Sequence, residues 1–299
     1  MNLALASDYE VRVRRDEPMA KHTSWRVGGP ADLFFTPRDR DDVASFLRAL
    51  PAAVPVYWVG LGSNLLVRDG GIRGVVICTH GAFTRLERRA QSRVYCDAGV
   101  PCARLARQCV SWNLSQGEFL AGIPGTLGGA LAMNAGAYGG ETWRQVRAVD
   151  VVDRRGTRHA RDPSEYQIGY RSVRGPAAEE WFLGAELEFE RSSTEQINEV
   201  RAQAQRRKQT QPLGLWSCGS VFTNPPNDHA ARLIEAAGLK GYRLGGAQVS
   251  EKHANFIINE GQASARDLEQ LIRHVQQTVL NASGVQLVPE VRIVGEDRP

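Results

Sequence analysis

The segment from Phe119 to Gly140, FLAGIPGTLGGALAMNAGAYGG, contains no charged side chain, and its glycines stand at 122, 125, 128, 129, 136, 139 and 140. An uncharged run of this length suggests a membrane span, but the continuous large apolar side chains of a span are missing. Glycine is costly inside a helix and useful where φ is positive or a backbone must approach closely. We therefore expect a loop and a short helix whose N–H groups face a ligand, and a phosphate suits such donors. Close packing of a Gly/Ala-rich helix on a sheet is the alternative.

The length of 299 residues allows one large domain or, as we expect, two. The composition, 42% hydrophobic and 23% charged, is ordinary for a globular protein. The net charge is +4, yet no dense basic run with interleaved aromatic residues occurs, so the sequence does not favour nucleic-acid binding. A small anionic substrate fits the charge equally well.

The N-terminal segment has no long apolar core behind a basic start, so we expect no signal peptide. The five cysteines form no CxxC pair and no metal-ligand spacing, and His22, His229, His253 and His274 form no ligand set, so we expect no metal site. Thiols kept reduced in a cytosol explain these cysteines most simply, and we expect a cytoplasmic protein.

Periodicity predicts an α+β fold, because strands outnumber helices in the first part of the chain. We expect strands over 54–60, 74–79, 92–99, 146–153 and 181–190, and helices over 41–50 and after Pro101. A boundary follows near Arg191, where Ser193–Gln196 matches a capping box that opens a polar helix. The remainder is a smaller α+β part, with helices over 229–238 and 264–281 and strands over 255–259 and 288–295.

A second glycine signal, GLGSNLLV at 60–67, follows a predicted strand. It is not a Rossmann fingerprint, since the third glycine, the following helix and the later acidic residue are all missing. No glycine run continues into Gly-Lys-Ser/Thr, which excludes a P-loop. The chain therefore has two phosphate-binding candidates and neither standard nucleotide motif.

Together with five further segments, these two loops resemble the family of UDP-N-acetylenolpyruvoylglucosamine reductases, flavoenzymes of peptidoglycan precursor synthesis. The matching pieces recur in family order over essentially the whole chain: HTSWRVGGPAD (22–32), GLGSNLLV (60–67), GIPGTLGGALAMNAGAYG (122–139), GYRS (169–172), SCGSVFTNP (217–225), GLKGYRLGGAQVSEKHANFIIN (238–259) and LVPEVR (287–292). The chain is similar to the shorter subtype, which lacks an extra tyrosine-bearing loop.

The resemblance implies a vanillyl-alcohol-oxidase-type (PCMH-type) FAD-binding domain of two subdomains over 1–191, and a C-terminal substrate-binding domain over 192–299. It implies FAD without a covalent link and NADPH as co-substrate. The cofactor-binding residues would be Gly60, Gly62, Ser63, Asn64, Leu65, Gly122, Ile123, Pro124, Gly125, Thr126, Gly128, Gly129, Ala135 and Gly136. Pyrophosphate would lie against Gly122–Thr126, since backbone amides offer several donors at once.

The family reaction passes hydride from NADPH through FAD to an enolpyruvyl group, which requires a cation for the carboxylate and a proton donor. By resemblance, Arg171 binds the carboxylate, Ser220 donates the proton and Glu290 helps stabilise the intermediate. Each residue taken alone has a structural alternative: a solvated arginine, a turn serine and a strand-edge carboxylate.

Four further residues match substrate positions of the family less securely: Lys208, Asn224, Tyr138 and Tyr242. Lys208 could instead meet a helix dipole, and the tyrosines could be core residues. We expect a monomer whose partners are the UDP-sugar and NADPH, without nucleic acid or membrane. An oxidase or dehydrogenase on the same flavin fold and a non-catalytic nucleotide-binding module are the competing hypotheses.

Overall fold

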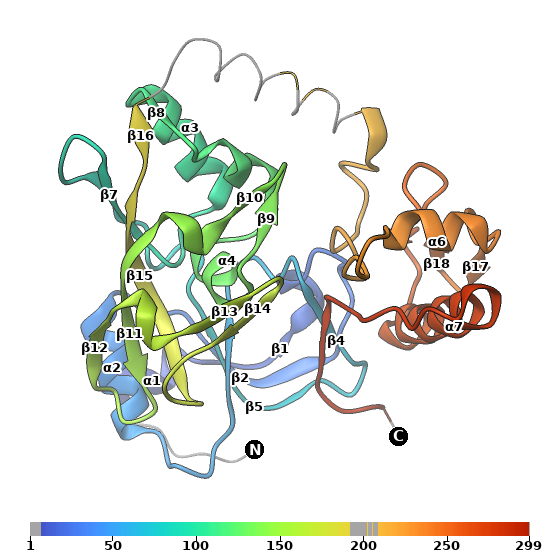
Figure 1. Ribbon diagram of the computed structural model, residues 1–299. Helices are drawn as coiled ribbons and strands as arrows, with labels where there is room; N and C mark the ends of the chain where they lie inside the picture. Colours follow the sequence, from blue (N-terminus) through green and yellow to red (C-terminus); the bar gives the residue numbers. More distant parts are fainter. Residues whose placement is uncertain (1–6, 192–201, 203–204, 206–208, 299) are drawn as a thin grey trace. The chain divides into compact units, whose positions relative to one another are not determined.

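The computed structural model describes residues 7–191, 202, 205 and 209–298 (Figure 1). Contacts divide the chain into two compact units, each built from separate stretches. The first unit comprises Met1–Arg15, Leu33–Leu61 and Gly74–Gln205, and the second Asp16–Asp32, Gly62–Arg73 and Arg206–Pro299. The sequence predicts two domains that each consist of one continuous stretch, divided after residue 191. The units found here interleave along the chain and do not test that division, which stays a prediction.

The largest sheet of the first unit is antiparallel throughout, in the order β12-β11-β15-β7-β6. Its strands are β6 (Leu86–Arg88), β7 (Arg93–Asp97), β11 (Val146–Asp153), β12 (Arg158–Arg161) and β15 (Glu180–Glu188). The strands predicted over 92–99, 146–153 and 181–190 are therefore confirmed as β7, β11 and β15. The turn between β11 and β12 uses Gly156 at a φ of 74°.

Helices α3 (Cys102–Ser111) and α4 (Leu127–Met133) contribute to one hydrophobic core of this unit, together with residues of β7, β11 and β15. Helix α3 begins after Pro101, as expected, and buries Leu105 and Cys109. Helix α4 is the short helix predicted within the glycine-rich run, which also holds η2 (Glu118–Gly122), β9 (Gly136–Ala137) and β10 (Gly140–Glu141).

A second core of the same unit lies under helix α2 (Arg40–Ala49), whose apolar face buries Val43, Phe46 and Leu47. Asp39 caps this helix by accepting a hydrogen bond from the Asp42 N–H at 2.8 Å. The neighbouring sheet has the order β1-β2-β5-β3, from β1 (Arg14–Pro18), β2 (Pro30–Phe35), β3 (Val56–Val59) and β5 (Ile72–Cys78).

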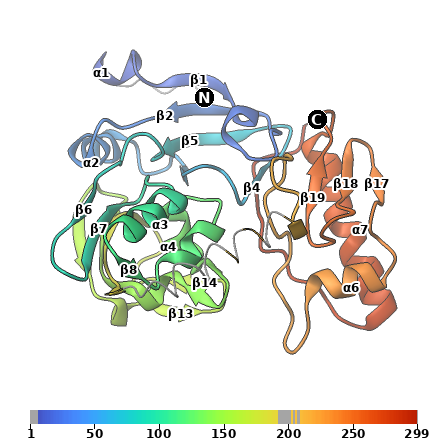
Figure 2. The same ribbon diagram turned by 90° about the horizontal axis from the view of Figure 1, so that it is seen from above.

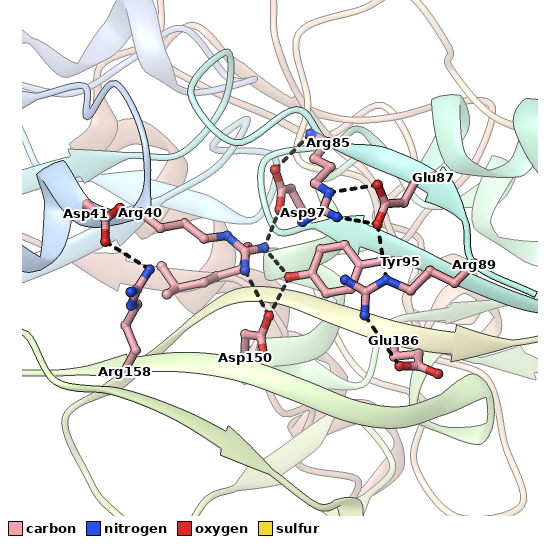
Figure 3. A network of polar contacts seen from close by, with 11 residues as sticks. Arg40, Asp41, Arg85, Glu87, Arg89, Tyr95, Asp97, Asp150, Arg158 and Glu186 are labelled. Atoms are coloured by element: carbon pink, nitrogen blue, oxygen red, sulfur yellow. Dashed lines mark hydrogen bonds and ion pairs between the residues drawn. The ribbon is translucent and has the colours of Figure 1, made fainter.

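A polar network joins the start of α2 to the large sheet (Figure 3). Arg40 pairs with Asp150 of β11 at 2.8 Å and with Asp97 of β7. The Tyr95 hydroxyl donates to the same Asp150 carboxylate at 2.6 Å. Because each buried polar group has a partner of opposite charge or a hydrogen bond, the network orders this side of the unit rather than destabilising it.

The second unit contains the antiparallel sheet β17-β18-β19 and helices α6 and α7 (Figure 2). It also contains a parallel pair of strands, β4 and β20. Their bounds are β4 (Leu65–Val67), α6 (Ala230–Ala236), β17 (Arg243–Leu244), β18 (Ala247–Val249), β19 (Ile257–Asn259), α7 (Ala265–Ser283) and β20 (Arg292–Val294). Helix α7 contacts all three strands of the sheet through an apolar face. The helices and strands expected in this region are therefore confirmed.

The remaining short elements are α1 (Ser7–Glu10), η1 (Met19–His22), β8 (Leu114–Ser115), η3 (Thr142–Gln145), η4 (Pro163–Glu165), β13 (Gln167–Gly169), β14 (Ser172–Arg174) and β16 (Glu190–Arg191). The capping box predicted at Ser193–Gln196 lies outside the described residues. All five cysteines are free and buried. Within the described ranges, no helix combines the length and the apolar character that crossing a bilayer requires.

Candidate active site

Two of the predicted cofactor segments meet in the first unit. A Cβ atom on Gly60 would lie 2.3 Å from the Thr126 hydroxyl oxygen, so only glycine allows this approach. Thr126 in turn caps α4, since its side chain accepts a hydrogen bond from the Gly129 N–H. The fold thus brings the start of the first glycine loop against the start of the short helix in the second.

The loop before α4 is held on the chain that follows β7. The Cys102 N–H donates to the Gly125 carbonyl at 2.9 Å, and the Leu127 N–H donates to the Val100 carbonyl at 2.9 Å. The Gly128 N–H donates to the Ala98 carbonyl at 2.8 Å. A Cβ on Gly128 would lie 2.9 Å from the Ala98 Cβ. Close helix packing, the alternative explanation of the glycine run, therefore accounts for Gly128.

The residues before α4 fit the phosphates of FAD. The N–H groups of Gly125 and Thr126 donate to no acceptor within the described part of the chain, although Thr126 is only 1% exposed. Leaving a buried donor unpaired costs about 1–3 kcal/mol, and a phosphate oxygen would supply the acceptor. Around Gly129, a Cβ would meet nothing closer than the Thr126 hydroxyl at 3.9 Å, which leaves room for a ligand.

Arg171 lies at the turn between β13 and β14, with a φ of 53°. Its guanidinium donates to the Gly136 carbonyl at 2.9 Å and to the Asn134 carbonyl at 3.3 Å. The Asn134 side chain donates to the Gly169 carbonyl at 3.1 Å and so ties the hairpin to the glycine-rich run. The predicted carboxylate-binding arginine therefore lies beside Gly136, one of the predicted cofactor residues.

The second unit brings the predicted serine and glutamate segments together. The Glu290 N–H donates to the carbonyl of Val221, the residue after Ser220, at 2.7 Å. The Asn64 side chain donates to the Glu290 carbonyl at 3.0 Å. Three separate motifs, at 60–67, 217–225 and 287–292, thus converge on one backbone network.

The two residues before Ser220 differ in their surroundings, because Gly219 has open space around it and Cys218 is buried. Gly219 has a φ of 81°, and a Cβ there would meet no atom within 4 Å. Burial raises the pKa of the Cys218 thiol, and the nearby charge of Glu290 raises it further. The thiol therefore stays protonated at neutral pH.

The other predicted residues have these positions. A Cβ on Gly62 would lie 1.9 Å from the His22 carbonyl oxygen, and Ser63 lies between Gly62 and Asn64. Leu65 pairs with Arg292 in the parallel β4–β20 pair. Gly122 ends η2, followed by buried Ile123 and exposed Pro124, and Ala135 is 7% exposed.

Among the predicted substrate residues, Tyr138 and Tyr242 are each 40% exposed. The Tyr242 ring stacks on His274 with centroids 4.4 Å apart. The Asn224 side-chain oxygen accepts from the Ala230 N–H at 3.1 Å, at the start of α6. Lys208 lies outside the described residues.

Sequence reasoning missed two buried asparagines, Asn255 and Asn259, which hydrogen-bond to the segment carrying Ser220. The sequence did contain a sign of these residues. They stand at the two ends of the apolar run NFIIN, where a buried polar side chain needs a hydrogen-bond partner. Among the described residues, no cluster of three or more His, Cys, Asp or Glu could hold a metal ion.

Two family models match parts of this chain. The family model described as UDP-N-acetylenolpyruvoylglucosamine reductase, C-terminal domain, matches residues 211–294. The model described as FAD binding domain matches residues 31–160. The α+β fold expected, an FAD-binding domain with a smaller C-terminal domain, is thereby confirmed.

Relatives match over nearly their whole length. The UDP-N-acetylenolpyruvoylglucosamine reductase of Methylococcus capsulatus is 58% identical, covering 94% of this chain and 92% of that protein. The protein of the same name from Alkalilimnicola ehrlichii is 56% identical, covering 95% of each. The crystal structure of UDP-N-acetylenolpyruvylglucosamine reductase from Thermus caldophilus has a TM-score of 0.81 at 33% identity, covering 94% of this chain and 98% of that one. The chain belongs to the UDP-N-acetylenolpyruvoylglucosamine reductase family.

Proposed function

We propose that this chain reduces the enolpyruvyl group of UDP-N-acetylglucosamine enolpyruvate with NADPH, giving UDP-N-acetylmuramate for peptidoglycan precursor synthesis. The observation that carries the proposal is the 58% identity to a reductase of this name over 94% of the chain. When bound, non-covalent FAD supplies the relay that takes hydride from NADPH and delivers it to the methylene carbon of the enolpyruvyl group. The match of the FAD-binding model to residues 31–160 supports this cofactor.

The residues of this chain then have separate tasks in the second half-reaction. Arg171, oriented by the carbonyls of Asn134 and Gly136, binds the substrate carboxylate, because a planar guanidinium can pair with both oxygens. Negative charge develops on the carbon next to the methylene and spreads into that carboxylate. The Glu290 carboxyl helps to stabilise it, and Ser220 donates a proton to this carbon, which completes the lactyl ether.

The division of labour follows the chain. Residues 1–191 bind FAD, including the loops at 60–65 and 122–136, and residues 192–299 bind substrate. Lys208, Asn224, Tyr138 and Tyr242 contact the UDP-sugar or NADPH. The enzyme acts in the cytoplasm, since its free cysteines suit a reducing compartment. It acts as a monomer, and light scattering of the purified protein measures this oligomeric state.

The proposal is tested by the visible spectrum of the purified protein. We expect flavin absorbance that bleaches on anaerobic addition of NADPH and returns on addition of the enolpyruvyl UDP-sugar. A colourless protein that still binds nucleotides would point to a non-catalytic module, and oxygen consumption with an alcohol would point to an oxidase.

The role of Ser220 is tested by replacing Ser220 with alanine. Because the proton is needed only after hydride leaves the flavin, bleaching by NADPH should stay within about twofold of the parent rate. Reoxidation by the sugar should slow by about 10²–10⁴-fold, the range for loss of a general acid. Ser217→Ala, in the same turn, is the matched control. Equal slowing of both steps would contradict the assignment.

A further inference from the structure

The turn that carries Ser220 is bounded by hydrogen bonds to two asparagines that flank one strand. Asn259 is the last residue of β19, and Asn255 lies two residues before that strand begins. Both side chains are buried, with 4% and 5% exposure for Asn255 and Asn259 respectively. A buried amide is retained at low cost only where its donors and acceptors are paired.

Asn255 binds the chain directly after Ser220. Its carbonyl accepts from the Val221 N–H at 2.9 Å. Its side-chain oxygen accepts from the Phe222 N–H at 3.0 Å, and its side-chain amide donates to the Phe222 carbonyl at 2.8 Å. One residue thus pairs with both backbone groups of Phe222, which neither a carboxylate nor an apolar side chain can do.

Asn259 binds the chain just before the turn. Its N–H donates to the Trp216 carbonyl at 2.9 Å. Its side-chain amide donates to the Trp25 carbonyl at 2.8 Å, and its side-chain oxygen accepts from the N–H groups of Gly261 and Ala263 at 2.8 and 3.0 Å. The Arg26 guanidinium lies 4.6 Å from the centre of the Trp216 ring, which adds a cation–π contact on the same residue.

Between these two anchors, Cys218 is buried in the hydrophobic core of the second unit. Gly219 has a left-handed φ and open space where a side chain would stand. The Glu290 N–H donates to the Val221 carbonyl, so the residue that Asn255 binds also sets the position of the Glu290 backbone. A displacement of about 1 Å in a catalytic group can cost about 10²-fold in rate, so the anchors have consequences for Ser220.

We propose that Asn255 and Asn259 are positioning residues that hold the Ser220 turn in the geometry for proton donation. They touch neither substrate nor cofactor in this role and act through the backbone on either side of the turn. The proposal rests on the proposed function of Ser220.

The test compares Asn255→Leu with Gln248→Leu. Gln248 is a matched control, because it is 7% exposed and lies on β18 opposite Ile258, while its hydrogen bonds lie away from the turn. In Asn255→Leu we expect reoxidation of the reduced flavin by the sugar to slow by about 10–100-fold, with bleaching by NADPH within about twofold. In Gln248→Leu both rates should stay near the parent values at a comparable loss of thermal stability.

A second measurement of the positioning role does not depend on enzyme activity. Amide hydrogen exchange of Phe222, whose N–H loses its acceptor on the side chain of residue 255, should accelerate in Asn255→Leu and not in Gln248→Leu. Where Asn255→Leu fails to unfold cooperatively, Asn255→Asp is measured by the same criteria, because it keeps the acceptor for the Phe222 N–H and replaces the donor to the Phe222 carbonyl with a charged oxygen. Asn259→Ala keeps the backbone N–H that binds the Trp216 carbonyl and loses only the side-chain bonds to Trp25, Gly261 and Ala263. We therefore expect reoxidation to slow less in this variant than in Asn255→Leu.

The outcomes separate the two proposals. Faster exchange with an unchanged reoxidation rate, or equal slowing of both half-reactions, would overturn the positioning role. If Ser220→Ala itself left reoxidation unchanged, the assignment of Ser220 as proton donor would fall instead, whatever the asparagine variants show.

Discussion

Gly62 illustrates how a single backbone position controls the first predicted cofactor loop. Its φ is 61°, and a Cβ would lie 1.9 Å from the His22 carbonyl oxygen. The Gly62 carbonyl also accepts from the Ser24 N–H at 3.2 Å, so the two segments cannot separate without losing this bond. The motif HTSWRVGGPAD thus supports the loop at 60–67 within the second unit.

Replacing Gly62 with alanine should therefore destabilise the protein by about 3 kcal/mol or more, since the clash is with backbone. The matched control is Gly284→Ala, which has a φ of 72° and no atom within 4 Å of the added Cβ. This control isolates the left-handed strain, about 1–2 kcal/mol. Urea unfolding of both variants measures the difference, and equal losses would show that the His22 contact is unimportant.

At the scale of elements, helix α7 depends on residues from outside the helix. Ser264 and Asp267 form a capping box at its start, and the Asp69 carboxylate accepts from the N–H groups of Ala265 and Arg266 at 3.0 Å each. Further along, Arg68 donates to both oxygens of buried Glu269, at 2.8 and 2.9 Å. The chain that follows β4 is therefore bound to the first turns of α7.

The ion pair of Arg68 and Glu269 predicts that the stability of the fold depends on pH. Hydrogen bonds from Arg68 hold the pKa of Glu269 below its ordinary value of 4.5. A carboxyl whose pKa is lower in the folded state stabilises the fold above its unfolded pKa, and the contribution is lost as the pH falls through the folded pKa. Glu269→Gln should thus be less stable at pH 7 by roughly 1.5–3 kcal/mol, with the difference shrinking as the pH falls below about 4.5.

Thermal melts of the parent and Glu269→Gln between neutral and acidic pH measure this difference. The change of this stability difference with pH should be much weaker when both proteins also carry Arg68→Met, because the hydrogen bonds that lower the pKa of Glu269 are then removed. A difference that stayed constant with pH would contradict the role of the ion pair.

At the scale of the molecule, the second unit has a core built from three stretches of the chain. Trp25, Val27 and Leu66 are each at most 4% exposed and pack with apolar residues of the C-terminal part. Strand β20 pairs with β4, which lies far earlier in the chain. A fragment that starts near residue 192 lacks these partners.

We therefore expect residues 192–299, expressed alone, to show no cooperative thermal transition by near-ultraviolet circular dichroism. The exposed apolar surface left by Trp25, Val27 and Leu66 should bind a hydrophobic dye. The full chain under the same conditions is the control. A sharp transition of the fragment would show that the C-terminal part folds without the earlier stretches.

Local patterns were enough to predict helices α2 and α7, strands β7, β11 and β15, and the short helix within the glycine-rich run. Apolar periodicity and capping residues act over a few positions, so they can be read along the chain. The family motifs likewise named Arg171, Ser220 and Glu290, whose roles stay predictions.

By itself, then, the amino-acid sequence determined the main helices and strands, the two glycine-rich segments and the family. Only the tertiary structure decided that Gly60 lies against Thr126, that Asn64 binds the Glu290 backbone, and that Asn255 and Asn259 bracket the Ser220 turn. These contacts join residues distant in the chain, and no local propensity encodes them, because each depends on where the whole fold places both partners.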